Sequence, residues 1–146
     1  MNKDDGLIQL LSEYWVVMLQ AKATLKVSYD RCKDISLLSD DLTMEDSDAL
    51  DALTSKFART SDLYTQKFLN GLLRLKRVDA PTYVDKMNNC EKAGIILSAE
   101  SMIAIRDLRN EIAHEYWLDQ LRDQQNYTIE HIPLLFINMD ETKLFM

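Results

Sequence analysis

Residues 43–77 read TMEDSDALDALTSKFARTSDLYTQKFLNGLLRLKR, and this stretch decides the fold class. Its first four residues have the spacing of a helix capping box, with aspartate where glutamate or glutamine is usual. Apolar residues then recur every three or four positions, at Leu50, Leu53, Phe57, Leu63 or Tyr64, Phe68, Leu72 and Leu75. That period predicts one long amphipathic helix from Thr43 to about Lys76.

The rest of the chain repeats the helical pattern. Helices are predicted from Leu7 to about Ile35, from Pro81 to about Gly94, from Ser98 or Ser101 to about Asp123, and from Ile132 to Phe145. In the first of them the apolar positions are Leu7, Leu10, Leu11, Tyr14, Val17, Met18, Ala21, Leu25 and Tyr29. Pro81 is expected in the first turn of its helix, and Gly94 as a left-handed cap. A polar break is expected at residues 124–128. The sequence therefore predicts a single all-α domain over residues 1–146, an antiparallel four-helix up-down bundle with a short C-terminal fifth helix.

Composition limits the classes of function. A formal net charge of -7 argues against broad, non-specific binding of nucleic acid, although it leaves room for a small local phosphate site. No apolar run is long enough for a membrane span, and the acidic N-terminus does not look like a signal peptide. Cys32 and Cys90 lack metal-ligand spacing, so reduced thiols in the cytoplasm are expected. No cluster of acidic residues and histidines predicts a metal or another cofactor.

Residues 106–116 gather side chains that carry chemistry. They read Arg106-Asp-Leu-Arg109-Asn110-Glu-Ile-Ala-His114-Glu-Tyr116, and Trp117 follows. Arginine can bind a phosphate through paired N–H donors, and histidine can exchange a proton near neutral pH. A tyrosine hydroxyl can accept a nucleotidyl group. The run therefore predicts a site that handles phosphate.

The spacing Arg-x4-His-x-Tyr resembles the signature of the HEPN superfamily. The segment Phe57–Tyr64, with Arg59 and Asp62, also looks like the second helix of many HEPN toxins, and a salt bridge there is expected to buttress the motif. HEPN domains are small helical bundles, usually homodimers whose motif helices face one another. Many are metal-independent ribonucleases or the toxins of toxin–antitoxin pairs. The resemblance thus implies an RNA substrate, tRNA or mRNA, and a cognate minimal nucleotidyltransferase as antitoxin.

Helical geometry places the motif residues on two faces. Arg106, Asn110 and His114 repeat every four positions, whereas Arg109 lies about 140° around a regular helix from His114. Three arrangements would reconcile them: the long arginine reaches around, the helix is irregular, or a partner chain supplies one group. The resemblance favours the third, a composite site in a dimer cleft.

The resemblance also assigns roles. His114 would move protons at the ribose 2′-hydroxyl and the leaving oxygen, and Arg109 would stabilise the charge on phosphorus. Asn110 and Arg106 would support them, and the products would be a 2′,3′-cyclic phosphate and a 5′-hydroxyl. Tyr116 would be the residue that the antitoxin adenylylates, with an ordinary buried tyrosine as the alternative.

Two other functions stay open at this point. One is a non-catalytic HEPN partner module that binds a nucleotide or a nucleotidyltransferase and uses Arg109 only as a phosphate ligand. The other is a structural bundle that mediates oligomerisation, which would leave the polar run of residues 106–116 without a role.

Overall fold

The computed structural model describes residues 3–35, 37, 42–114 and 118–143, and these residues are helical apart from short connections. The elements are α1 (Lys3–Cys32), α2 (Met44–Asp62), the π-helical segment η1 (Leu63–Leu69), α3 (Asn70–Leu75), α4 (Tyr83–Lys92), α5 (Ala99–Glu111) and α6 (Leu118–Lys143). The predicted all-α class is confirmed.

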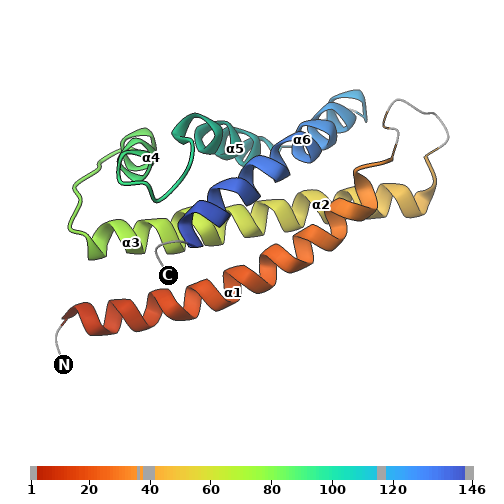
Figure 1. The fold of residues 1–146 in the computed structure, drawn as a ribbon. Helices are drawn as coiled ribbons and strands as arrows, with labels where there is room; N and C mark the ends of the chain where they lie inside the picture. The colour runs from red at the N-terminus through yellow and green to blue at the C-terminus, as the bar shows by residue number, and fades with distance from the viewer. Residues whose placement is uncertain (1–2, 36, 38–41, 115–117, 144–146) are drawn as a thin grey trace.

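The first layer is an antiparallel hairpin of two long helices (Figure 1). One is α1, and the other is the continuous run of α2, η1 and α3, which we call the rod. The predicted capping box begins the rod: the Thr43 hydroxyl accepts a hydrogen bond from the Asp46 amide at 3.0 Å, and the Asp46 carboxylate accepts one from the Thr43 amide at 3.4 Å. The rod thus covers almost the whole range predicted for one helix.

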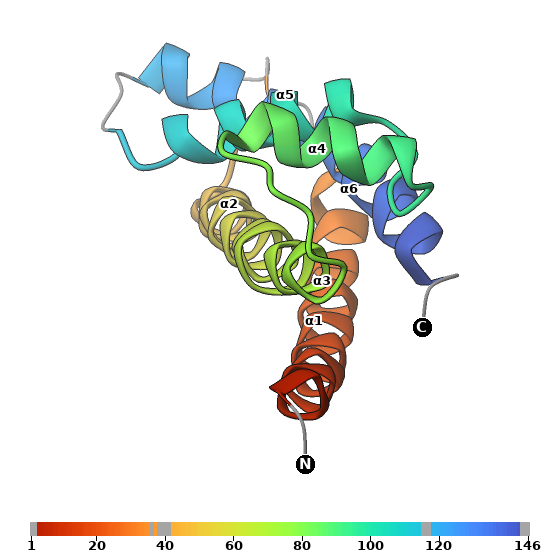
Figure 2. The same ribbon diagram turned by 90° about the vertical axis from the view of Figure 1, so that its left-hand side faces the viewer.

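In the second layer, α4 and α5 lie on the side of the rod away from α1, whereas α6 contacts both the rod and α1. Both α4 and α5 cross the hairpin at a steep angle, and α6 returns diagonally over it (Figure 2). The helices therefore form a bundle, but α4 and α5 do not run up and down beside the hairpin as the sequence analysis predicted. The connections into and out of α4 are short, and its buried residues Met87 and Cys90 contribute to the shared core.

The C-terminal part of the chain also differs from the prediction. The last helix has 26 residues and includes segment 124–128, which was predicted to be a break. Gln124 and Gln125 are buried there because their side-chain amides donate to Glu111 and Asp51, respectively. The helix continues through Pro133 and also contains His131.

Several smaller predictions can be compared with the structure. Gly94 has φ 75°, as expected of a left-handed cap. Thr82, not Pro81, caps α4, so the proline lies just before the helix. Leu63 and Tyr64 were the alternatives for one apolar position on the rod, and Tyr64 is the one that is fully buried. On α1, Leu10 and Val17 are exposed, although they were assigned to the apolar stripe.

The core lies between the two layers. Its largest fully buried side chains include Phe57, Tyr64 and Phe68 on the rod and Met18 and Leu25 on α1. Each such side chain contributes roughly 1.5–3 kcal/mol by leaving water. No helix among the described residues combines the length and the apolar character that a membrane span needs.

Candidate functional site

Arg109 lies in the last turn of α5 and is held by Asp62, the last residue of α2. Its Nε donates to Asp62 Oδ1 at 2.8 Å and its Nη2 to Asp62 Oδ2 at 2.9 Å. The two side chains are 29% and 32% exposed, so the pair stands at the surface of the junction between the layers. Hydrogen bonding to Asp62 raises the pKa of Arg109, and the guanidinium stays charged. The predicted buttress of the motif is thus confirmed for Asp62.

This contact determines which part of the guanidinium can meet a ligand. Asp62 occupies the edge formed by Nε and Nη2. Nη1 and the second hydrogen of Nη2 form a separate edge, which can donate two parallel hydrogen bonds to one anion. Asp62 therefore orients Arg109 and leaves it one bidentate donor edge for a phosphate.

α5 ends between Arg109 and His114. Ile112 is its C-cap residue, and the His114 amide donates to the Glu111 carbonyl at 3.0 Å in the turn that follows. His114 lies past the end of α5, where it is exposed. The prediction that it shares a helical face with Arg106 and Asn110 is therefore wrong. The helix is thus interrupted between Arg109 and His114, which was one of the three arrangements considered. The favoured arrangement, in which a partner chain supplies one group, stays a prediction.

The supporting residues are placed differently from the prediction. Arg106 stacks over the ring of Tyr83 on α4, with its guanidinium carbon 4.6 Å from the ring centroid. It therefore points towards α4 and not towards His114. Asn110 is exposed at the end of α5. Tyr116, the predicted site of adenylylation, lies outside the described residues.

A cavity of about 370 Å³ opens beside Arg109. It is lined by Ser55, Ala58, Arg59, Asp62, Leu63, Gln66, Lys67 and Arg109. Except for Arg109, the lining residues come from one face of the rod, where they recur every three or four positions. Gln66 and Lys67 were not predicted as site residues. They belong to a polar stripe on the rod opposite its apolar stripe, and that pattern is visible in the sequence.

The cysteines give no sign of chemistry. Cys32 and Cys90 are both buried as free thiols. Burial raises the pKa of Cys90 to about 11, which keeps its thiol protonated and unreactive at neutral pH. Within the described ranges, no three of the residue types that ligate metals stand close enough together to hold an ion.

Comparisons with protein-family models, with curated proteins and with solved structures found no match to this chain. An assignment of function therefore rests on the motif and on the geometry around Arg109.

Proposed function

We propose that this protein is a metal-independent endoribonuclease toxin of the HEPN type. It would act in the cytoplasm on tRNA or mRNA, as a homodimer, and under the control of a cognate minimal nucleotidyltransferase antitoxin. The observation that carries the proposal is the bidentate contact between Asp62 and Arg109 at the mouth of a nucleotide-sized cavity. A guanidinium oriented in this way loses little conformational entropy when it binds a phosphate, because its side chain is already ordered.

The cavity supplies further positive charge. Arg59 and Lys67 line it with Arg109, and among the described lining residues Asp62 is the one acidic side chain. Such a cluster can hold a phosphate despite a net charge of -7, because exposed charges farther than about 8–10 Å are largely screened at physiological salt.

His114 would carry the proton transfers. In the proposed reaction the ribose 2′-oxygen attacks phosphorus, the bond from phosphorus to the 5′-oxygen breaks, and a 2′,3′-cyclic phosphate forms. The His114 imidazole takes the proton of the 2′-hydroxyl and, once protonated, gives it to the leaving 5′-oxygen. Exposure of His114 on the turn after α5 is compatible with contact between its ring and a substrate.

The first test is cleavage of total tRNA and mRNA by the purified protein in excess EDTA. Arg109→Ala and His114→Ala are each expected to abolish cleavage. His131→Ala is the matched control, because that histidine lies within α6, where its ring bonds to the Tyr127 carbonyl, and not on the turn after α5. A requirement for Mg²⁺, or cleavage that survives His114→Ala, would refute the mechanism.

A second test asks whether the site is shared between two subunits. Inactive Arg109→Ala and His114→Ala proteins are mixed after their dimers have been dissociated and reassociated. A composite site predicts recovery of about a quarter of wild-type activity, because half of the dimers would be mixed and each would hold one intact site. No recovery would place Arg109 and His114 of one chain in the same site.

The surface of α1 is a candidate dimer interface that bears on this test. Ile8, Val16, Leu19 and Val27 are exposed apolar residues on it, and they offer a surface for self-association. However, the rod separates α1 from α5 (Figure 1). A dimer formed through α1 would keep the two Arg109 residues apart, and mixing would then restore nothing.

The alternative is a non-catalytic partner module that binds a nucleotide or a nucleotidyltransferase. One observation favours it: Asp62 neutralises Arg109, which weakens the attraction of the pair for a developing negative charge. Absence of cleavage by wild-type protein without modification at Tyr116, together with measurable binding of ATP that Arg109→Ala removes, would establish this alternative.

A further inference from the structure

A second cavity adjoins the first along the rod. It has a volume of about 400 Å³ and is lined by Gln66, Asn70, Leu73, Arg74, Val78, Asp79, Ala80 and Lys86. Gln66 lines both cavities, so the two are neighbours along the rod, with Arg109 of α5 beside one and Lys86 of α4 beside the other, and together we call them the groove. From Ser55 to Arg74 the groove follows the rod for about 28 Å at the helical rise per residue.

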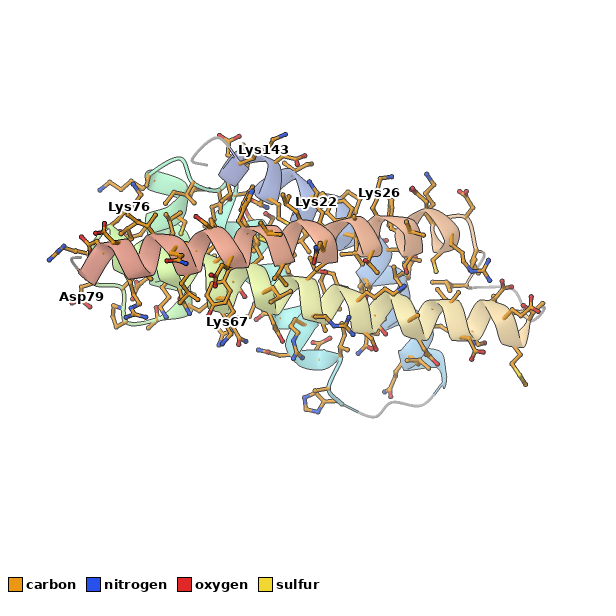
Figure 3. All side chains as sticks on the ribbon, turned by 90° about the horizontal axis from the view of Figure 1, so that it is seen from below. Lys22, Lys26, Lys67, Lys76, Asp79 and Lys143 are labelled. Atoms are coloured by element: carbon orange, nitrogen blue, oxygen red, sulfur yellow. The ribbon has the colours of Figure 1, made fainter. Side chains whose placement is uncertain are left out.

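Positive charge follows this groove from end to end. Its cationic residues are Arg59, Lys67, Arg74, Lys86 and Arg109. Its acidic residues are Asp62, which is paired with Arg109, and Asp79. The groove thus carries a surplus of positive charge on a chain whose net charge is -7. Figure 3 shows Lys67 projecting on the side of the hairpin opposite to Lys22, Lys26 and Lys143, so this residue of the groove is separate from those lysines.

The shape and the lining indicate which polyanion fits. Each cavity has the volume of a site for one small ligand, and the two lie end to end, as an extended single strand requires. The described lining residues include no aromatic side chain on which a base could stack. Arginine, lysine, glutamine and asparagine instead offer donors to phosphate and ribose oxygens.

We propose that this groove binds the phosphodiester backbone of single-stranded RNA over several consecutive nucleotides. The cavity beside Arg109 holds the reacting phosphate and its neighbour, and Arg74 and Lys86 hold phosphates farther along the same strand. The inference rests on the proposed ribonuclease function and adds to it a substrate class: unpaired RNA, recognised through its backbone with little preference among bases.

Recognition of this kind has a measurable salt dependence. For single strands, the logarithm of the binding constant falls with the logarithm of salt concentration with a slope of about -0.7 for each phosphate that is neutralised. Four such contacts give a slope of about -3, and removal of two of them makes it shallower by about 1.4.

The test measures binding in the His114→Ala background, in which the RNA would stay intact. The probe is a fluorescein-labelled oligouridine RNA of about twelve nucleotides, and its anisotropy is followed between about 50 and 200 mM salt. Arg74→Glu/Lys86→Glu is expected to weaken binding at least about tenfold and to reduce the slope by about 1.4. The matched control is Lys92→Glu/Lys143→Glu, which changes the net charge equally at exposed positions outside the groove.

Three results would overturn the proposal: equal losses in both double variants, no loss in either, or equally tight binding of a duplex of the same length. Cleavage by wild-type protein is measured separately. If cleavage is absent but binding depends on Arg74 and Lys86, the groove stands and the ribonuclease function fails. If cleavage is present but binding is insensitive to them, the groove fails and the function stands.

Discussion

The two ends of α5 are held in different ways. At its N-terminus, Asn138 of α6 accepts hydrogen bonds from the amides of Leu97 and Ser98, both at 3.0 Å. The side-chain amide of Asn138 donates to the Ser101 hydroxyl at 2.8 Å. Glu91 accepts a further bond from the Ala99 amide. Asn138 is 1% exposed, so this end of the helix is fixed by a buried and satisfied polar network.

At the C-terminal end, the side-chain contacts of the described residues are fewer, and one of them is a partly exposed ion pair. Gln124 donates to the Glu111 carbonyl at 3.1 Å, and Arg109 bonds to Asp62 at the surface. The exposed turn that carries His114 follows directly. Among the described residues, the candidate site therefore lies at the end of α5 that has fewer side-chain hydrogen bonds, while the Asn138 network holds the other end in place. A ligand can therefore reorder the site without disturbing the core.

Replacement of Asn138 by alanine tests the fixed end. The change removes the buried Asn138 side chain and leaves the partly buried amides of Leu97 and Ser98 without their acceptor, and each such group costs about 1–3 kcal/mol. We expect a loss of about 4 kcal/mol in the free energy of unfolding and a decrease of roughly 12 °C in Tm. Urea and thermal denaturation measure both.

Asn126→Ala is the control, because this asparagine lies on the same helix but is exposed and bonds only to Glu130. It should change stability by less than about 0.5 kcal/mol. Equal effects of the two substitutions would show that the buried network does not distinguish the ends of α5.

Alkaline pH should also weaken the fixed end. Burial raises the pKa of Cys90 to about 11 from its ordinary 9.0, so the folded state disfavours the thiolate. The stability that this provides is complete below about pH 9 and is lost as the pH rises through about 11, by up to about 2–3 kcal/mol. The Cys90 carbonyl accepts from the Ile95 amide, which places this loss in the turn before α5.

The measurement is the free energy of unfolding against pH for wild type, Cys90→Ala and Cys32→Ala. Cys90→Ala should make the stability curve shallower between about pH 9 and 11. Cys32→Ala should preserve more of the slope, because the pKa of Cys90 is raised more than that of Cys32. Parallel curves for all three proteins would show that the tyrosines buried nearby account for the alkaline loss.

The sequence predicted the helices because their apolar period is a local property. Leu50, Phe57 and Phe68 recur at helical spacing whatever they pack against, and the capping box at Thr43 is complete within four residues. The π-helical segment was not predictable in this way, since apolar residues continue at three- and four-residue steps through it. Only the backbone hydrogen bonds of the folded chain distinguish it from an ordinary helix.

The break between α5 and α6 was misplaced for a different reason. Gln124 and Gln125 look like loop residues in the sequence, but their partners Glu111 and Asp51 lie 13 and 74 positions away. Long-range partners of polar residues leave no periodic signal. The contact of Arg109 with Asp62 spans 47 positions. Arg109 was singled out by the chemistry of residues 106–116, and Asp62 only through the family resemblance.

Asp62→Asn should have the smallest effect on stability and a large one on function. The ion pair is about one-third exposed, so its loss should cost less than about 1 kcal/mol. If Asp62 positions Arg109, the loosened guanidinium should lower the kcat of RNA cleavage at least about tenfold. KM should not rise, because a negative charge leaves the groove. Asp48→Asn, at an exposed position of the same helix, is the control.

The direction of the change in kcat decides between two roles of this contact. A decrease in kcat with constant or lower KM means that Asp62 orients Arg109 for the reaction. Catalysis then depends on this one carboxylate at the C-terminal end of α5. An increase in kcat means that Asp62 restrains Arg109 in the unliganded protein and that substrate must displace it. No change in kcat would mean that the Asp62 contact has no part in catalysis. Like the Asn138 network, it would then only hold α5 in place.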